Sequence, residues 1–323
     1  FVIDRQLTLM PLDNTSKISN GFIHLVKGSD GSTVSGLTIN NTKGALSING
    51  IYVGQLHGIW ITKSNNNTIV NNTIRIANAA GVYAMPMGWS SYNRIIGNDM
   101  STYITCVMVM GQCHYNIISK NKLETLDYND LIVSNLIYFN PFGHADYGGS
   151  PLCLGNVISD NYLKAFCNGA MSIVLQLVYE NHINTTIANN TIIRGSYGIS
   201  LYSDNATVYN NTIIESSISV SAMGKNISVT YNNVTGTSQG NGILVNGEKG
   251  YSAIVAHNNV TFTDIYCAIG LSNYTEAFNN TVNIKNYGVG ISITDNCSYV
   301  HDNKIKVNHD NAITFIGCNN TIS

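Results

Sequence analysis

The stretch NNTIVNNTI at residues 66–74 contains the phrase Asn-Asn-Thr-Ile twice, and the phrase returns at 189–192, 210–213 and 319–322. In general form, the repeated unit is an aliphatic residue, two variable residues, an asparagine, one variable residue and a second aliphatic residue. Ten copies of this unit follow one another along the chain, each anchored by an asparagine. The anchors are Asn72, Asn98, Asn121, Asn161, Asn190, Asn211, Asn232, Asn258, Asn280 and Asn303.

Successive anchors are 21 to 29 residues apart, except for one interval of 40 residues between Asn121 and Asn161. Between anchors, a glycine followed by alternating residues recurs, as in GIYV at 50, GIWI at 58 and GISL at 198. Such alternation is typical of short strands with one buried face. A unit of about 22 residues without helical spacing predicts one turn of a parallel β-solenoid. Two other repeat folds are disfavoured. Leucine-rich repeats would show a signature of several leucines, which is absent, and a β-propeller would need about 40 to 45 residues per blade.

We therefore expect an all-β parallel β-helix of about 12–13 coils that forms one domain over 1–323. Residues 1–33 keep the repeat less regularly. Residues 124–155, within the long interval, are expected to form an expanded coil or a loop that leaves the wall.

The asparagines have a structural explanation in a solenoid. Equivalent residues of successive coils stack about 4.8 Å apart, so each side-chain amide is expected to donate to the next coil and accept from the previous one. Asparagine also tolerates the left-handed backbone conformation of a sharp turn. We expect the anchors to form a buried ladder at a corner, with the aliphatic residues filling the interior. NNTIVNNTI then contains two successive corners of one coil, at Asn67 and Asn72.

Composition limits the partners. The 323 residues are only 11% charged with a net charge of -2, which argues against nucleic acid. Forty-six asparagines and 29 glycines disfavour helical domains. No apolar run reaches the roughly 20 residues of a membrane span, and the first ten residues lack signal-peptide features, so this segment reads as a mature protein or an excised piece.

The repeats resemble those of the right-handed parallel β-helix repeat family. They are similar in particular to NNTI-rich surface proteins of methane-producing archaea, of adhesin-like, sheath or surface-layer type, and to NosD-like β-helix proteins. The resemblance covers roughly residues 30–323 and implies a right-handed helix. It is weak for activity because the same helix carries adhesins, envelope components and polysaccharide lyases and hydrolases.

Catalytic motifs are sparse. The Asp pairs, Gly-His-Gly and Arg-x-Lys phrases that polygalacturonase-like hydrolases would show do not occur, so we expect no catalytic residue, no cofactor and no metal site. The single aspartates in LYSDN and SITDN are expected to cap turns. The long interval is the best remaining place for a site, although solvated loop acids explain it as well. Its polar residues are Glu124, Asp127, Asp130, His144, Asp146 and Tyr147.

Four aromatic residues cluster in the N-terminal third: Tyr52, Trp60, Tyr83 and Trp89. If their side chains point outward from strands, they could stack on sugar rings. Ordinary covering of the solenoid wall explains them equally well.

Two cysteine pairs are candidates for disulfides. Cys113 and Cys153 each precede an anchor by eight residues, which predicts that they stack on neighbouring coils. Cys297 and Cys318 occupy nearly equivalent positions. Each pair could form a disulfide, which would suit an extracellular protein, or fill a buried column with free thiols.

Many Asn-x-Ser/Thr sequons fall one or six residues before an anchor, where the side chain should point outward. They are candidate glycosylation sites, although sugars on adjacent coils would collide. The sites are Asn66, Asn71, Asn184, Asn189, Asn205, Asn210, Asn226 and Asn279.

From these features we expect a non-catalytic protein at the cell surface or envelope, an adhesin-like stalk or a sheath or surface-layer building block. Its expected partners are further copies of itself, end to end or lateral, or a cell-surface polysaccharide. The alternative is a polysaccharide-acting β-helix lyase or glycoside hydrolase. An acidic cluster lining a groove would favour the alternative.

Overall fold

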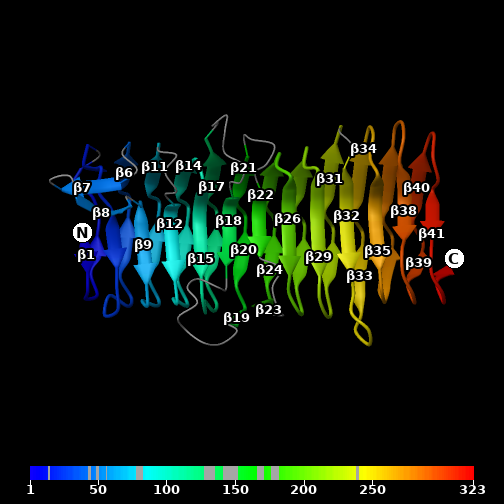
Figure 1. Cartoon of the computed structure of the whole chain (residues 1–323), viewed down its shortest axis with the longest axis horizontal. Helices are drawn as coiled ribbons and strands as arrows, with labels where there is room; N and C mark the ends of the chain where they lie inside the picture. The colour runs from blue at the N-terminus through cyan, green and yellow to red at the C-terminus, as the bar shows by residue number, and fades with distance from the viewer. Residues whose placement is uncertain are drawn as a thin grey trace. The chain divides into compact units, whose positions relative to one another are not determined.

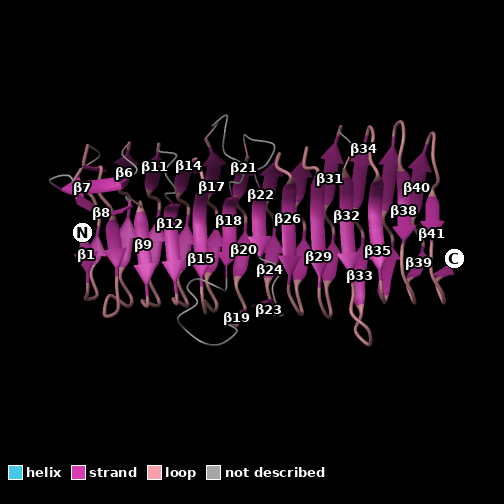
Figure 2. Ribbon diagram, in the orientation of Figure 1, coloured by secondary structure: helices cyan, strands magenta, loops and turns pink. Residues whose placement is uncertain are grey.

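The computed structural model describes residues 1–13, 15–42, 45–48, 51–55, 57–77, 83–126, 135–140, 152–165, 171–175, 182–237 and 240–323. The chain divides into two compact units, Phe1–Met171 and Ser172–Ser323, which we call the N-terminal and C-terminal units. The described residues form strands and turns, and Figure 2 draws no helix among them. They accordingly contain no helix long and apolar enough to span a membrane.

The predicted right-handed parallel β-solenoid is confirmed, with about 12 coils. In each unit the coils contribute strands to three parallel sheets, A, B and C (Figure 1).

In the N-terminal unit, sheet A contains β1 (Val2–Ile3), β4 (Ile23–Leu25), β9 (Ile59–Thr62), β12 (Tyr83–Gly88), β15 (Thr105–Met110) and β18 (Asn135–Asn140). Sheet B contains β2 (Thr8–Leu9), β5 (Thr33–Ser35), β10 (Thr68–Val70), β13 (Arg94–Ile96), β16 (Ile117–Ser119) and β20 (Val157–Ser159). Sheet C contains β3 (Lys17–Ser19), β6 (Thr38–Asn41), β11 (Thr73–Ile76), β14 (Asp99–Thr102), β17 (Lys122–Thr125) and β21 (Tyr162–Lys164).

In the C-terminal unit, sheet A contains β22 (Met171–Leu175, which begins at the boundary), β26 (Tyr197–Tyr202), β29 (Ile218–Met223), β32 (Asn241–Asn246), β35 (Cys267–Ser272), β38 (Val289–Ile293) and β41 (Ile313–Phe315). Sheet B contains β24 (Thr186–Ala188), β27 (Thr207–Tyr209), β30 (Ser228–Thr230), β33 (Ala253–Ala256), β36 (Thr275–Phe278), β39 (Tyr299–His301) and β42 (Thr321–Ile322). Sheet C contains β25 (Thr191–Ile193), β28 (Thr212–Ile214), β31 (Asn233–Gly236), β34 (Asn259–Phe262), β37 (Thr281–Ile284) and β40 (Lys304–Val307). The short strands β19 (Cys153–Leu154) and β23 (His182–Ile183) belong to the N-terminal and C-terminal unit, respectively.

The aliphatic residues of the repeat fill the interior. On sheet B, Ile69 pairs with Ile95, and Ile95 pairs with Ile118, in unbroken parallel register. These three side chains are fully buried. The strands keep their register because a shift by one residue would turn every buried side chain toward solvent.

The anchor asparagines form a ladder at the corner between sheets B and C. The backbone N–H and the Nδ2 of Asn72 both donate to Oδ1 of Asn98 at 3.0 Å, and Nδ2 also donates to the Val34 carbonyl at 3.0 Å. Asn98 donates to Asn121 in the same way. The same pattern joins Asn190, Asn211, Asn232, Asn258, Asn280 and Asn303 in the C-terminal unit.

A second buried ladder at the corner between sheets A and B occurs in the N-terminal unit. Asn67 donates to Oδ1 of Asn93, Asn93 to that of Asn116, and Asn116 to that of Asn156. The sequence interpretation recognised only Asn67 of this column as a corner. The signal was present, because each of these residues precedes an anchor by five positions.

One expectation about the corners needs correction. The anchors themselves do not have positive φ; the left-handed residues come directly before the ladder residues, such as Asn71 (φ 56°) and Asn66 (φ 58°). The turn and the ladder are therefore made by two adjacent residues, because the ladder residue must place its side chain inward.

One interpretation of a local phrase was also wrong. Ile51–Val53 of the phrase GIYV belongs to an antiparallel hairpin, β7 (Ala45–Ile48) and β8 (Ile51–Gln55), instead of a solenoid sheet (Figure 1). Within the long interval, β18 pairs in register with β15 in sheet A, which agrees with the expanded-coil alternative and not with a loop that leaves the wall there. The acids and His144 expected in this interval lie outside the described residues, except Glu124, which forms a 3.5 Å ion pair with Lys122.

Candidate functional site

The outer face of sheet A in the C-terminal unit carries small and polar side chains. One outward column passes through Ser200, Ser221, Leu244, Gly270 and Ser292, which pair from strand to strand. Their inward neighbours, such as Ile291 and Ile293 of β38, are fully buried, so the outward positions leave the core intact. The face presents hydroxyl groups beside an aliphatic side chain.

A groove of about 420 Å³ is hollowed into this face, and we call it the sheet A groove. Gly270 deepens it, because a Cβ atom there would come within 2.5 Å of Leu244 Cδ2. Ser272 and Thr294 at its edge share a 2.7 Å hydrogen bond between their hydroxyl groups. Its other polar lining residues are Ser221, Asn241, Asn246 and Ser292.

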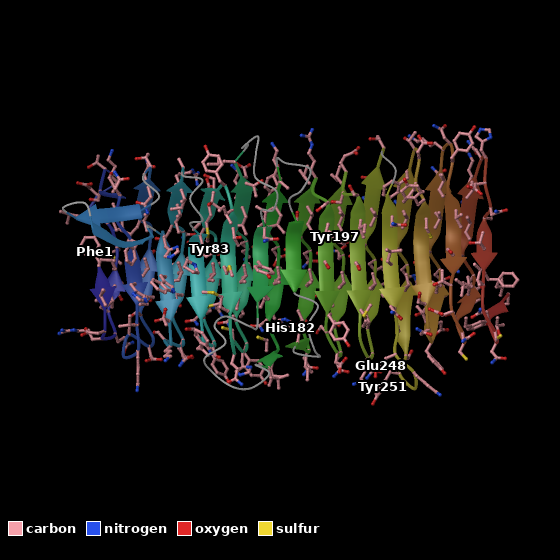
Figure 3. The ribbon with its side chains drawn as sticks, viewed as in Figure 1. Phe1, Tyr83, His182, Tyr197, Glu248 and Tyr251 are labelled. Carbon is pink, nitrogen blue, oxygen red and sulfur yellow. The ribbon has the colours of Figure 1, made fainter. Side chains whose placement is uncertain are left out.

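A second pocket of about 450 Å³ adjoins the groove, and the two share Met223 and Asn246. It lies at the turns from sheet A to sheet B, and we call it the turn pocket. Tyr202, Glu248 and Tyr274 line it. In Figure 3, Glu248 and Tyr251 lie close together on the turn after β32.

Glu248 belongs to a charged cluster spread over three successive turns. Nζ of Lys225 lies 3.5 Å from Oδ2 of Asp204 and 3.7 Å from Oε2 of Glu248. The same ammonium group sits 5.4 Å from the centre of the Tyr251 ring. Attraction to two carboxylates and to a ring face holds the lysine in place.

The two carboxylates of this cluster differ in their contacts and in their exposure. Asp204 also accepts the Lys225 backbone N–H at 2.9 Å, which is the turn-capping role expected for the aspartate in LYSDN. Because Lys225 lies within 3.5 and 3.7 Å of them, the Asp204 and Glu248 oxygens are at most about 7.2 Å apart. Glu248 is partly exposed and reaches the turn pocket, whereas Asp204 is largely covered.

Tyr274 supplies a phenol to the same pocket. Desolvation and the neighbouring Cys297 thiol raise the pKa of Tyr274 above its ordinary value. The phenol is protonated at neutral pH, as that of tyrosine ordinarily is, and can donate a hydrogen bond to a hydroxyl group.

Two of the aromatic residues predicted to contact sugar, Trp60 and Tyr83, stack on histidine side chains of the wall. Trp60 points outward but stacks on His24, with ring centres 4.1 Å apart and planes 3° apart. Tyr83 stacks in the same way on His57 at 5.8 Å. Stacking along the coils covers one face of each ring, so these side chains serve at least partly to cover the wall.

Trp89 and Tyr52 complete the predicted aromatic set. The Trp89 ring lies over Gly111 of the next coil, where a Cβ atom would come within 2.6 Å of it. Tyr52 is in β8, and its side chain lies outside the described residues. His57 nearby is largely buried, and desolvation lowers its pKa to about 4. Carbohydrate contact at these four residues stays a prediction.

The predicted disulfides do not form in this structure. Cys113, Cys153, Cys297 and Cys318 are free thiols. Cys113 donates to the Met110 carbonyl and Cys153 to the Gly111 carbonyl, both at 3.3 Å, so each sulfur is turned toward a backbone acceptor. Burial raises the pKa of both thiols, that of Cys153 to about 11.

The sequon asparagines lie at exposed turns. All eight have positive φ values, which asparagine adopts more readily than most residues. Some also pair across coils, as Nδ2 of Asn210 donates to Oδ1 of Asn189 at 2.9 Å. Turn geometry thus accounts for the asparagines without glycans, and glycosylation stays a prediction.

Metal ligands are not grouped in the part of the chain that the structure describes: no three His, Cys, Asp or Glu side chains there could share an ion. The ring nitrogens of His301 contact two carboxylates, those of Glu276 at 3.0 Å and Asp302 at 2.8 Å.

Comparisons with known proteins identify the fold. No protein-family model matches the sequence, and no curated protein matches it. The chain is similar in structure to the A-module of a mannuronan C-5 epimerase from Azotobacter vinelandii, with a TM-score of 0.57, 11% identity and coverage of 94% of this chain and 90% of that one. It is also similar to a tailspike of Pseudomonas phage phi297, with a TM-score of 0.52, 12% identity and coverage of 89% and 45%. A surface protein and adhesin of Streptococcus pneumoniae matches with a TM-score of 0.45, 11% identity and coverage of 95% and 88%, too distant to bear on function.

The expectation of a non-catalytic surface building block is wrong. Of these three matches, the two with TM-scores above 0.5 are an epimerase of mannuronan and a tailspike, and a groove with a carboxylate beside it lies on the C-terminal unit. The sequence interpretation searched for motifs within one coil and missed a cluster built from three coils. Its signal was the charged pair Asp204 and Lys225, each seven residues before an anchor.

Proposed function

We propose that this chain is an enzyme that acts on a polysaccharide in the sheet A groove and the turn pocket of its C-terminal unit. The observation that carries the proposal is the position of Glu248, a carboxylate held by Lys225 in the turn pocket, which adjoins a groove lined with hydroxyl and amide groups. Sugar-binding sites need such hydrogen-bonding groups next to apolar contacts.

Each residue of the cluster has a distinct part. Glu248 exchanges a proton with the glycan as a general acid or base, since it lines the pocket and is partly exposed. Lys225 orients Glu248, and Asp204 orients Lys225 from the covered side. Tyr202 and Tyr274 flank the sugar with phenol groups.

The comparisons support this proposal at the level of fold only. A β-helix of this kind carries the A-module of a mannuronan C-5 epimerase, so the scaffold is compatible with polysaccharide chemistry. An extracellular location would place the enzyme with such substrates.

The test is an assay of purified protein on a panel of wall, algal and plant polysaccharides, with new reducing ends and unsaturated products measured separately. We expect Glu248→Gln to lower the rate at least 100-fold, the usual range for loss of a general acid or base. Glu215→Gln is the matched control, because Glu215 is an exposed turn carboxylate that hydrogen bonds Thr237 instead of lining the groove. Absence of product from every polysaccharide, or an equal effect of both substitutions, would refute the proposal.

Three of the sequence predictions accompany this function as proposals. Glycans on the exposed sequon asparagines would appear as hexose increments in the intact mass of the native protein. Self-association of the chain would appear as a concentration-dependent increase in light-scattering mass. The kinship with surface proteins of methanogenic archaea would appear as clear sequence similarity once such proteins are aligned with this chain.

A further inference from the structure

The sheet A groove contains no charged side chain. Its lining is made of hydroxyl, amide, thiol, backbone and aliphatic groups, with Ser221, Asn246, Ser272 and Thr294 among the polar ones. Met223 and Leu244 supply apolar surface between them. A ligand placed here meets hydrogen-bonding groups and carbon surface but no counter-charge.

The lysine of the charged cluster is already neutralised. Lys225 is shared between Asp204 and Glu248, so the cluster as a whole carries one excess negative charge. The turn pocket adds Lys249, which is exposed and adjacent in sequence to Glu248. Together these four side chains have no net charge, and neither lysine is among the residues that line the groove.

We infer that the groove binds a neutral glycan and discriminates against polyuronates and other polyanions; the inference rests on the proposed function. A polyuronate would place a carboxylate on every sugar against a lining without cations, and burying an unpaired charge is costly. The charged cluster of Asp204, Lys225 and Glu248, with one excess negative charge, would not attract it either. A neutral chain would lose no charge solvation and could pair its hydroxyl groups with the lining.

The charge class also selects the reaction. Elimination and C-5 epimerisation both begin by removing a proton beside a carboxylate, which a neutral sugar lacks. For a neutral glycan the cleavage is hydrolysis: the glycosidic C–O bond breaks, the hydroxyl of water bonds to the anomeric carbon, and the proton of water ends on the leaving oxygen. Glu248, ionised beside Lys225, would take the proton from that water as a general base, and the proton would pass to the leaving oxygen, with no electron donor or acceptor required.

Binding and activity are tested separately. Affinity electrophoresis of the purified chain is run in gels containing a neutral glycan (galactomannan, β-glucan or xyloglucan) or a polyuronate (alginate or polygalacturonate). We expect retardation by at least one neutral glycan, none by the polyuronates, and no loss of retardation when salt is added.

A groove-filling substitution locates the site. Ser292→Trp places an indole on the outer face of β38, and we expect at least tenfold weaker binding of the retained glycan. Thr261→Trp is the matched control, because Thr261 is an equally half-buried outward residue on β34 of sheet C. Circular dichroism spectra that match the wild type show that both variants fold.

The outcomes separate the two claims. Retention of a neutral glycan without any product would overturn the proposed enzyme but leave the inference about the groove standing. Glu248-dependent activity that prefers a polyuronate would overturn the inference and leave the enzyme standing. Equal weakening by both tryptophan substitutions, or no retention by any glycan, would overturn the inference.

Discussion

The two units are built from the same coil but differ at the corner between sheets A and B. In the N-terminal unit this corner holds the buried ladder of Asn67, Asn93, Asn116 and Asn156. In the C-terminal unit, buried residues of several kinds occupy the equivalent positions. They are Thr185, Ala206, Ile227, Ala253, Thr275 and Ser298.

The charged cluster and the turn pocket lie at this second kind of corner. Asp204 and Lys225 come directly before the turns that lead to Ala206 and Ile227, and Tyr251 comes just before Ala253. A ladder places the same amide at the end of every turn, even where the turn itself is long, as between β18 and Asn156. Without one, the residues at the corner also vary, and functional groups from different coils can meet. The corner between sheets B and C keeps its ladder in both units and maintains the register.

The largest expected effect is on stability in the N-terminal unit. Asn93→Ala removes the acceptor of two Asn67 donors, which lie 2.9 Å from it, and leaves them buried. We expect the free energy of unfolding to fall by roughly 2 to 4 kcal/mol, measured by denaturant titration. Thr68→Ala, an outward neighbour in β10, should cost under about 0.5 kcal/mol. Equal effects of the two changes would show that the ladder is not a source of stability.

The reverse exchange tests whether the C-terminal corner has lost the ability to hold a ladder. Ala206→Asn brings an amide into a filled column beside Ile227, so we expect destabilisation by roughly 1 to 3 kcal/mol. Adding Ile227→Asn supplies a partner and should recover part of that loss in the same titration. A stabilising Ala206→Asn would mean that the two corners differ only in sequence.

The third prediction concerns activity at the C-terminal corner. Lys225→Met leaves Asp204 and Glu248 without the cation between them, so the carboxylates should repel each other and Glu248 should move. We expect kcat to fall about tenfold or more with a smaller change in KM, and Lys225→Arg to restore part of the rate. A change confined to KM would contradict a positioning role for Lys225.

The smallest effect is a pH dependence at the sheet B surface. Hydrogen bonds that His301 donates to the Asp302 and Glu276 carboxylates raise its pKa, so protonation stabilises the folded state. This stabilisation is fully present below the unfolded pKa of about 6.5 and is lost as the pH rises through the folded value. Thermal melts should therefore show His301→Gln less stable than the wild type near pH 5 and similar to it near pH 9. An equal difference at both pH values would rule out this contribution.

The sequence predicts the fold because stacking repeats one physical constraint at every coil. Ile69, Asn72 and Ile74 are constrained by burial, by the ladder and by register at once, and so the pattern survives in every copy. The hairpin β7–β8 was not predicted because GIYV at 50 has the same alternation as GIWI at 58. Alternation indicates a strand but does not show which strand it pairs with.

The candidate site was harder to predict because its residues come from different coils. Asp204, Lys225 and Glu248 are each single charges within turn sequences. Only the stacking of the coils brings the two carboxylates within 4 Å of the Lys225 ammonium group. Asp204 and Lys225 share an offset from their anchors, which sequence reasoning could have used. Glu248 lies in a longer turn and has no such offset.

The anchor ladder also has a direction. The N–H and Nδ2 groups of each asparagine donate to the following coil, as those of Asn72 do to Asn98, and never wait for an acceptor from the preceding anchor. A coil therefore presents a backbone N–H and a side-chain N–H to the coil that follows it, so each folded coil favours one register for the next.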